Sequence, residues 1–165
     1  MKSRECHQTG FGFDSHAFST AGTLVLGGLK FPGIPSLKGH SDGDVLLHAL
    51  IDALLGGAGL GDMGDFFPDT SARYKGIDSL ILLEKALAQV TRKGFRPVHV
   101  DMTVVAEKPR LTPVKSKIKV RLARLLKIPP VSFNIKGKTP EGLLLFPSSG
   151  GILVWVVATL QKIKK

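Results

Sequence analysis

Apolar and polar positions divide the chain into five extended segments and three amphipathic helices. Runs of β-branched, aromatic and other apolar residues predict strands over residues 9–18, 23–31, 98–105, 131–135 and 152–160. Gly22 separates the first two segments, and Pro32 ends the second. We expect these two segments to pair with each other as a β-hairpin.

Apolar positions at helical spacing predict helices over residues 43–55, 79–93 and 113–127. Ser41 or Asp42 is expected to cap the first helix, and the pair Gly56-Gly57 to end it. Gly94 ends the second helix, and residues 59–70 form a turn-rich loop. Strands and helices alternate without repeats or a low-complexity linker, so we expect one α/β (α+β) domain over residues 1–165.

Composition narrows the class of protein without naming a function. The 165 residues, 43% apolar and 22% charged, suit one globular domain with its own core. The lone Cys6 excludes an internal disulfide and a thiolate zinc knuckle, so a metal would need His and carboxylate ligands. The chain has neither an apolar run of ~18 residues nor a signal-like N-terminus. We expect a cytoplasmic protein with no membrane partner.

The net charge of +10 raises the question of an anionic partner. Lys and Arg concentrate between residues 108 and 138. On the predicted helix 113–127 they surround one apolar stripe, made of Val114, Ile118, Leu122, Leu125 and Leu126. This pattern favours a solvated helix face, with steering of an anionic small molecule as the alternative. Few aromatic residues interleave with the charges, which disfavours nucleic acid.

Three residues form a candidate metal site. Asp14 and His16 are two apart in a predicted strand, so both side chains point to the same face. His48 lies in a predicted helix, with Asp44 and Asp52 one turn to either side as candidate partners of its imidazole N–H. One carboxylate and two imidazoles with an open position suit catalytic zinc. Spacing alone leaves open that these histidines only satisfy hydrogen bonds.

A candidate anion site begins at the loop that enters the first predicted helix. His40-Ser41-Asp42-Gly43-Asp44 places backbone N–H groups and the positive end of the helix dipole at this turn. Helix capping explains the same residues equally well. The segments 61–69 and 106–111 are either further binding loops or connectors.

The motifs also occur in a recognisable order. Gly12-Phe13-Asp14-x-His16, the block from His40 to Gly56, Gly61-Asp62-x-Gly64 and Phe67-Pro68-Asp69 together closely resemble the 2-C-methyl-D-erythritol 2,4-cyclodiphosphate synthase family. The resemblance runs from Gly10 to the final strand. It implies an enzyme of non-mevalonate isoprenoid biosynthesis, formally a phosphorus–oxygen lyase. Such an enzyme closes 4-diphosphocytidyl-2-C-methyl-D-erythritol 2-phosphate to 2-C-methyl-D-erythritol 2,4-cyclodiphosphate and releases CMP.

The resemblance also implies roles for individual residues. Zinc would be held by Asp14, His16 and His48, a second divalent ion (Mg or Mn) by Glu141 with the diphosphate, and the transition state would be stabilised by His40 and Thr139. The implied substrate-binding residues are Asp14, Ser15, His16, His40, Ser41, Asp62, Met63, Gly64, Phe67, Pro68, Asp69, Thr70, Ser71, Ala106, Glu107, Lys108, Pro109, Arg110, Leu111, Thr112, Lys138, Thr139, Pro140, Glu141, Leu145 and Ser148.

The resemblance further implies a mostly antiparallel or mixed sheet of four to five strands, covered by helices on one face. It also implies a homotrimer with active sites between neighbouring subunits. The segment 138–151 departs from the family pattern: Ser148 replaces an arginine, and Pro140 removes a backbone donor near the diphosphate. We predict retained activity, with weaker nucleotide binding or an altered response to anionic ligands in the trimer channel. A zinc or manganese phosphoesterase and a non-catalytic nucleotide-binding relative are the alternatives.

Overall fold

A four-stranded mixed sheet forms the centre of the computed structural model, which describes residues 6–143 and 150–163. The strands are β1 (His7–Ala17), β4 (Phe95–Ala106), β5 (Phe133–Lys138) and β6 (Gly151–Lys162), in the order β1-β6-β4-β5. β6 is antiparallel to both neighbours, whereas β4 and β5 are parallel. The expected mixed sheet is therefore confirmed, with four strands.

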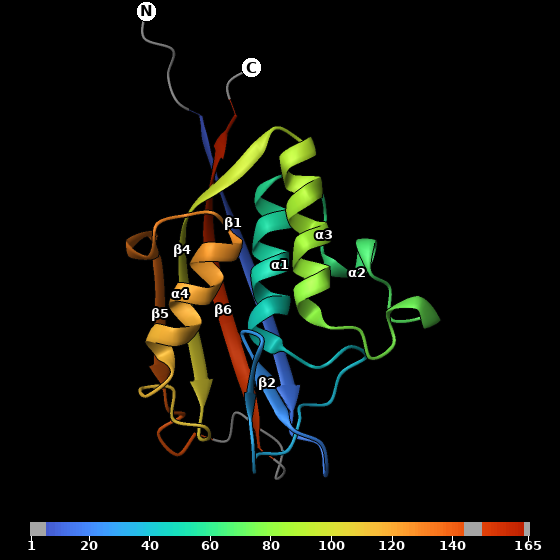
Figure 1. The fold of residues 1–165 in the computed structure, drawn as a ribbon, viewed down its shortest axis with the longest axis vertical. Coiled ribbons are helices and arrows are strands. Elements are labelled where there is room, and N and C mark those ends of the chain that lie inside the picture. Colours follow the sequence, from blue (N-terminus) through green and yellow to red (C-terminus); the bar gives the residue numbers. More distant parts are fainter. Residues whose placement is uncertain (1–5, 144–149, 164–165) are drawn as a thin grey trace, which may run out of the picture.

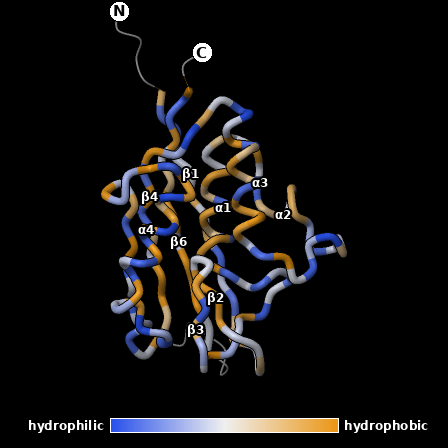
Figure 2. Tube along the Cα trace, viewed as in Figure 1, coloured by the Kyte–Doolittle hydropathy of each residue, from blue (hydrophilic) through white to orange (hydrophobic). Residues whose placement is uncertain are grey.

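Three helices cover one face of this sheet: α1 (Val45–Gly57), α3 (Ser79–Arg92) and α4 (Lys115–Leu125) (Figure 1). Side chains of β4 and β6 that point toward the helices, such as Val104 and Val156, are fully buried. Buried and more exposed positions alternate along much of β4, and Figure 2 shows that β6 is mostly hydrophobic. The core thus lies between the sheet and the helices, as expected from the sequence.

The helix α1 packs against β1 with almost no space between the two backbones. A Cβ atom added to Gly10 would lie 1.9 Å from the Ala53 carbonyl oxygen, and one added to Gly12 would lie 2.0 Å from that of Ala49. Any side chain at these positions would push the helix off the strand. The two glycines therefore set how closely α1 approaches β1.

The predicted hairpin between residues 9–18 and 23–31 is wrong. β1 pairs along its whole length with β6, from His7 opposite Gln161 to Ala17 opposite Gly151. Residues 23–31 instead form a small hairpin of their own, β2 (Leu24–Leu26) with β3 (Leu29–Phe31). Gly27 and Gly28 both have positive φ and make the two-residue turn between them. That turn splits what the hydrophobic pattern presented as one strand.

Element boundaries differ from the prediction mainly at α1. Its N-cap is Asp44, not Ser41 or Asp42, and the helix includes Gly56 and Gly57, with Ala58 as its C-cap. The predicted loop 59–70 contains a short helix, α2 (Met63–Phe66). Short 3-10 turns occupy Ala72–Tyr74 and Pro130–Ser132, and the second of these delays the start of β5 to Phe133.

The two ends of the sheet differ in what they contain. β1, β4 and β5 run in the same direction, because β6 is antiparallel to both β1 and β4 and β5 is parallel to β4. Their carboxyl ends therefore lie at the same end of the sheet, where Figure 1 shows the loops that follow β4 and β5. The start of β1 and the end of β6 lie at the opposite end of the sheet. Among the described helices, none has the length and apolar character needed to cross a membrane.

Candidate metal centre and the pockets beside it

The contact between α1 and β1 brings the three predicted metal ligands together. His16 Nε2 lies 2.8 Å from Asp14 Oδ2, and His48 Nδ1 lies 3.0 Å from the same oxygen. The two ring nitrogens are 3.2 Å apart. His48 is nearly buried, and Asp14 and His16 are partly buried. His48, which is 32 and 34 positions from His16 and Asp14, thus joins them so that the three side chains present one ligand atom each to a single point.

The spacing of these ligand atoms fits a metal ion. Tetrahedral zinc binds nitrogen and oxygen at about 2 Å, which places two ligand atoms roughly 3.3 Å apart. The observed separations of 2.8 to 3.2 Å lie close to that value. Among the described residues, these three form the one His, Cys, Asp or Glu group that could hold a metal ion. The arrangement leaves the fourth tetrahedral position for a further ligand.

Asp14 and His16 shift each other's pKa values toward the charged forms. Burial alone would raise the pKa of Asp14, but hydrogen bonds and opposite charge from His16 and His48 hold it well below its usual range. Burial alone would lower the pKa of His16, but Asp14 and a hydrogen bond to the Lys38 backbone raise it above its usual value. A carboxylate that stays ionised beside imidazoles is an attractive site for a cation.

The second ring nitrogen of His48 has partners that the sequence did not indicate. His48 Nε2 lies 2.9 Å from Ser41 Oγ and 3.0 Å from Ser79 Oγ. The predicted partners are wrong: Asp44 accepts from the N–H groups of the β2–β3 turn at 3.0 and 2.7 Å, and Asp52 accepts from the Met63 N–H at 2.7 Å. Ser79 comes from the distant start of α3, where only its place after the helix cap Asp78 is visible in the sequence.

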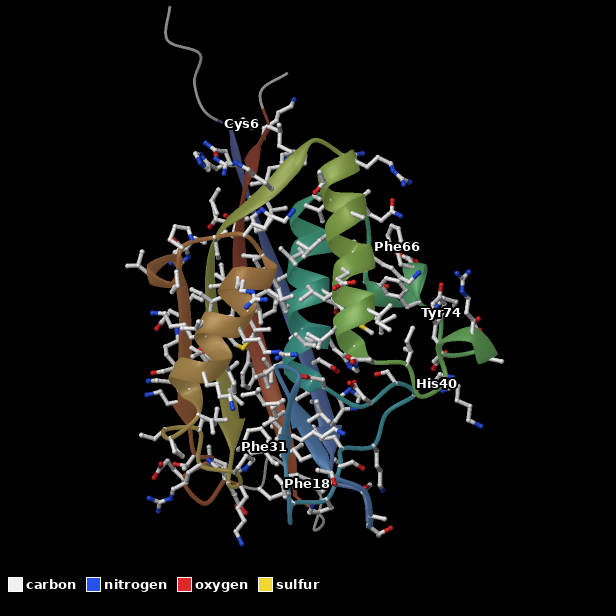
Figure 3. The ribbon with its side chains drawn as sticks, viewed as in Figure 1. Cys6, Phe18, Phe31, His40, Phe66 and Tyr74 are labelled. Carbon is white, nitrogen blue, oxygen red and sulfur yellow. The ribbon has the colours of Figure 1, made fainter. Side chains whose placement is uncertain are left out.

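A cavity of about 490 Å³ opens beside the metal centre. Of the residues predicted to bind substrate, those that line it are Asp14, His16, His40, Ser41, Met63, Phe67 and Asp69. Lys38 and Tyr74 also line it and were not predicted. Figure 3 shows His40 and Tyr74 on the same flank of the molecule, and the Gly76 N–H donates to the His40 carbonyl at 2.8 Å. A cation, an imidazole and a phenol thus surround the space beside the metal ligands.

A second pocket of about 500 Å³ lies at the carboxyl ends of β4 and β5. Of the predicted substrate-binding residues, those that line it are Ala106, Glu107, Pro109, Arg110, Leu111, Thr112, Lys138, Thr139 and Glu141. Lys115, at the start of α4, completes it and was not predicted. Its lining carries three cationic side chains, Arg110, Lys115 and Lys138, which suits an anionic ligand.

Comparison with known proteins decides the family. Residues 7–161 match the YgbB family. This chain belongs to the YgbB family. The resemblance found in the sequence motifs is thereby confirmed.

Named relatives of this YgbB-family chain fall into two lengths. It is 47% identical over 154 residues to the 2-C-methyl-D-erythritol 2,4-cyclodiphosphate synthase of Syntrophobacter fumaroxidans, covering 93% of this chain and 97% of the relative. It is 46% identical over 153 residues to the bifunctional enzyme IspD/IspF of Aliarcobacter butzleri, covering 93% of this chain and 41% of the relative. The chain thus spans about two fifths of the bifunctional protein and nearly all of the shorter one.

The fold agrees with these relatives. A solved structure of 2C-methyl-D-erythritol-2,4-cyclodiphosphate synthase in a CDP-bound form superposes with a TM-score of 0.84 at 34% identity, covering 93% of this chain and 99% of that one. The YgbB-family chain therefore shares the whole architecture, sheet and helices together, with that enzyme.

Within one YgbB-family chain the predicted site residues form two groups. Thr139 and Glu141 contact each other at the β4–β5 pocket, and neither lines the cavity beside the metal ligands. Ser15 is exposed, and Asp62 joins Asp65 in a capping box that starts α2. The residues that line neither pocket are Ser15, Asp62, Gly64, Pro68, Thr70, Ser71, Lys108 and Pro140. Leu145 and Ser148 lie outside the described residues.

Proposed function

We propose that this protein converts 4-diphosphocytidyl-2-C-methyl-D-erythritol 2-phosphate to 2-C-methyl-D-erythritol 2,4-cyclodiphosphate and CMP. In our proposal it acts as a cytoplasmic phosphorus–oxygen lyase of isoprenoid precursor synthesis. The observation that carries this is the convergence of Asp14, His16 and His48 beside a cavity, in a chain 47% identical to a synthase of that name. The CDP-bound state of a structural relative supports a cytidine diphosphate substrate.

The reaction is an internal displacement at phosphorus. An oxygen of the 2-phosphate forms a bond to the β-phosphorus, and the bond from that phosphorus to the CMP oxygen breaks, so CMP leaves with the electron pair. The substrate supplies its own nucleophile, so the protein must fold the chain of the substrate and neutralise charge. This requirement agrees with pockets that offer cations, imidazoles and hydroxyls.

Asp14, His16 and His48 would hold zinc, which when bound supplies Lewis-acid polarisation of the β-phosphate. His40, Ser41 and Lys38 line the same cavity, where the imidazole, the hydroxyl and the cation can orient the erythritol phosphate. In the second pocket Arg110, Lys115 and Lys138 would bind the cytidine diphosphate. Thr139, which lines the same pocket, would stabilise the leaving group. Glu141 would hold a second divalent ion, Mg or Mn.

A homotrimer with shared active sites follows as part of this proposal. The two pockets are separate within one chain, so a neighbouring copy would supply the second half of each site. The open face of the sheet carries exposed Phe11, Phe13 and Val157, and the tilted rings of Trp155 and Phe13 have centroids 5.3 Å apart. Large apolar groups in one exposed patch favour a protein interface. Light scattering of the purified protein measures the mass; a monomer that makes product would refute shared sites.

Product analysis tests the activity. Purified protein is incubated with the substrate and zinc, and phosphorus NMR follows the products while chromatography quantifies CMP. The proposal expects a cyclic diphosphate and one CMP per substrate. A phosphoesterase would instead release inorganic phosphate, and a non-catalytic relative would leave the substrate intact. Either outcome would reject the proposed reaction.

A further inference from the structure

The buried hydroxyl of Ser79 connects the candidate metal centre to a carboxylate outside it. Ser79 is the first residue of α3 and is fully buried. Its Oγ donates to Asp42 Oδ1 at 2.5 Å, and its backbone N–H donates to Asp42 Oδ2 at 3.2 Å. The same Oγ lies 3.0 Å from His48 Nε2. The chain Asp42, Ser79, His48 therefore ends at a ligand atom of the metal centre.

The direction of these hydrogen bonds determines which ring nitrogen of His48 carries the proton. A hydroxyl has one proton, and Ser79 gives its proton to Asp42. Toward His48, Ser79 can then only accept. An N–H on His48 Nε2 satisfies this contact. Nδ1 is then the ring nitrogen that faces Asp14 Oδ2 and His16 Nε2, and when zinc is bound its lone pair is the one available to the metal ion.

Ser41 lies at the same ring nitrogen but is placed differently. Its Oγ is 2.9 Å from His48 Nε2 and 3.2 Å from Ser79 Oγ, so it shares the N–H. Ser41 lines the cavity, where a ligand can compete for its hydroxyl. Ser79 does not line the cavity, and Asp42 holds it by two hydrogen bonds. The partner that keeps its orientation when the cavity fills is Ser79.

We infer that Ser79, held by Asp42, is a positioning residue that fixes the tautomer and ring orientation of His48 and thereby sets metal affinity. The inference rests on the proposed use of Asp14, His16 and His48 as a zinc site, and it is independent of which phosphate ester reacts. It assigns a role to two residues from separate segments, the loop before α1 and the start of α3. Neither residue contacts Asp14 or His16 through an observed hydrogen bond.

Zinc affinity of three variants tests the inference. Competition with a chromophoric chelator is measured for the wild-type protein, Ser79→Ala, Ser79→Thr and Asp78→Ala. Loss of such an outer partner typically weakens metal binding by about 10- to 100-fold, which is the expected effect of Ser79→Ala. Ser79→Thr keeps the hydroxyl and should recover most of the affinity. Asp78→Ala removes the α3 cap on the Leu80 N–H in the same turn and should leave zinc affinity unchanged.

The outcomes separate the hypotheses. Wild-type protein without zinc affinity would reject the metal centre itself. A wild-type protein that binds zinc together with an equally tight Ser79→Ala would overturn the role of Ser79. Equal losses in Asp78→Ala and Ser79→Ala would attribute the effect to fraying of α3 and would also overturn it.

A spectroscopic measurement removes the dependence on variant folding. Nitrogen-15 NMR of imidazole-labelled wild-type protein with bound zinc, at about pH 8, reports which nitrogen of each ring is protonated. We expect His48 in the Nε2–H form. An Nδ1–H form of His48 would contradict the inference whatever the variants do.

Discussion

The metal centre and the pocket at the ends of β4 and β5 are built in opposite ways. At the metal centre, each side chain is buried or partly buried and His48 has partners on both ring nitrogens. At the β4–β5 pocket, Arg110, Lys115, Lys138 and Glu141 are all exposed. Pro140, which departs from the family pattern, lies in sequence between Thr139 and Glu141 of that pocket. We therefore expect substitutions of the buried metal ligands to weaken binding strongly. Substitutions of the exposed charged residues of the β4–β5 pocket should weaken binding only modestly.

The largest effect should come from removing a metal ligand. If structural zinc binding of about 10–16 kcal/mol is divided among four ligands, His48→Ala weakens zinc binding by roughly 10²- to 10³-fold. CMP formation should fall with it. Chelator competition measures the affinity, and His99→Ala, which changes an exposed histidine on β4, is the control. Undiminished zinc affinity in His48→Ala would remove this histidine from the ligand set.

A substitution that separates α1 from β1 should have the next largest effect, on both stability and zinc binding. In Gly12→Ala the new Cβ would meet the Ala49 carbonyl oxygen, so we expect a loss of roughly 3 kcal/mol in unfolding free energy and weaker zinc binding. The matched control is Gly56→Ala in α1, where no atom lies within 4 Å of the added Cβ. That change should stabilise the helix by roughly 0.5–1 kcal/mol. Urea unfolding of both variants compares them; equal stabilities would contradict the backbone contact.

The pH dependence of zinc binding should reflect His16. Asp14 and the Lys38 backbone raise the pKa of His16 above its usual value, and zinc must displace that proton. Below that pKa, zinc affinity should fall about tenfold for each pH unit, and it should level off above it. Asp14 does not add to this fall, because its pKa is held well below the same range. Chelator competition from about pH 5 to pH 8 measures the profile; a flat profile would show that His16 is not a ligand.

The smallest effect is expected at the exposed pocket. Removing one solvent-exposed charge typically costs about 0.2–1 kcal/mol, so Lys138→Ala should weaken CDP binding roughly two- to fivefold and reduce its salt dependence. Lys117→Ala removes a charge from α4 outside the pocket lining and serves as the control. Calorimetric titration with CDP at two salt concentrations makes the comparison. Equal weakening by both variants would indicate a general charge effect.

Local patterns in the sequence predicted what depends on local spacing. The two-residue period placed Asp14 and His16 on one face of β1, and the helical period placed the apolar stripe of α4, whose Ile118 and Leu122 are fully buried. The predicted stop at Gly94 similarly marks the end of α3. Motif order then identified the family without further structural information.

Long-range pairing could not be predicted in this way. β1 pairs with β6, which comes more than 130 residues later, and nothing near residue 9 marks that partner. Asp44 lies one helical turn before His48, yet its carboxylate instead accepts hydrogen bonds from the N–H groups of Gly27 and Gly28 in the nearby turn. Ser79 reaches His48 only because α3 packs beside α1. Tertiary packing, rather than spacing, selects these partners.

The placement of the start of β1 and the end of β6 has a practical consequence for handling and fusing this protein. The start of β1 and the end of β6 lie at the end of the sheet opposite the loops that follow β4 and β5 (Figure 1). A purification tag, a fluorophore or a second catalytic module attached beyond these strand ends would be connected at the end of the sheet opposite the β4–β5 pocket. Labels at the termini are therefore suited to measuring ligand binding there without blocking access.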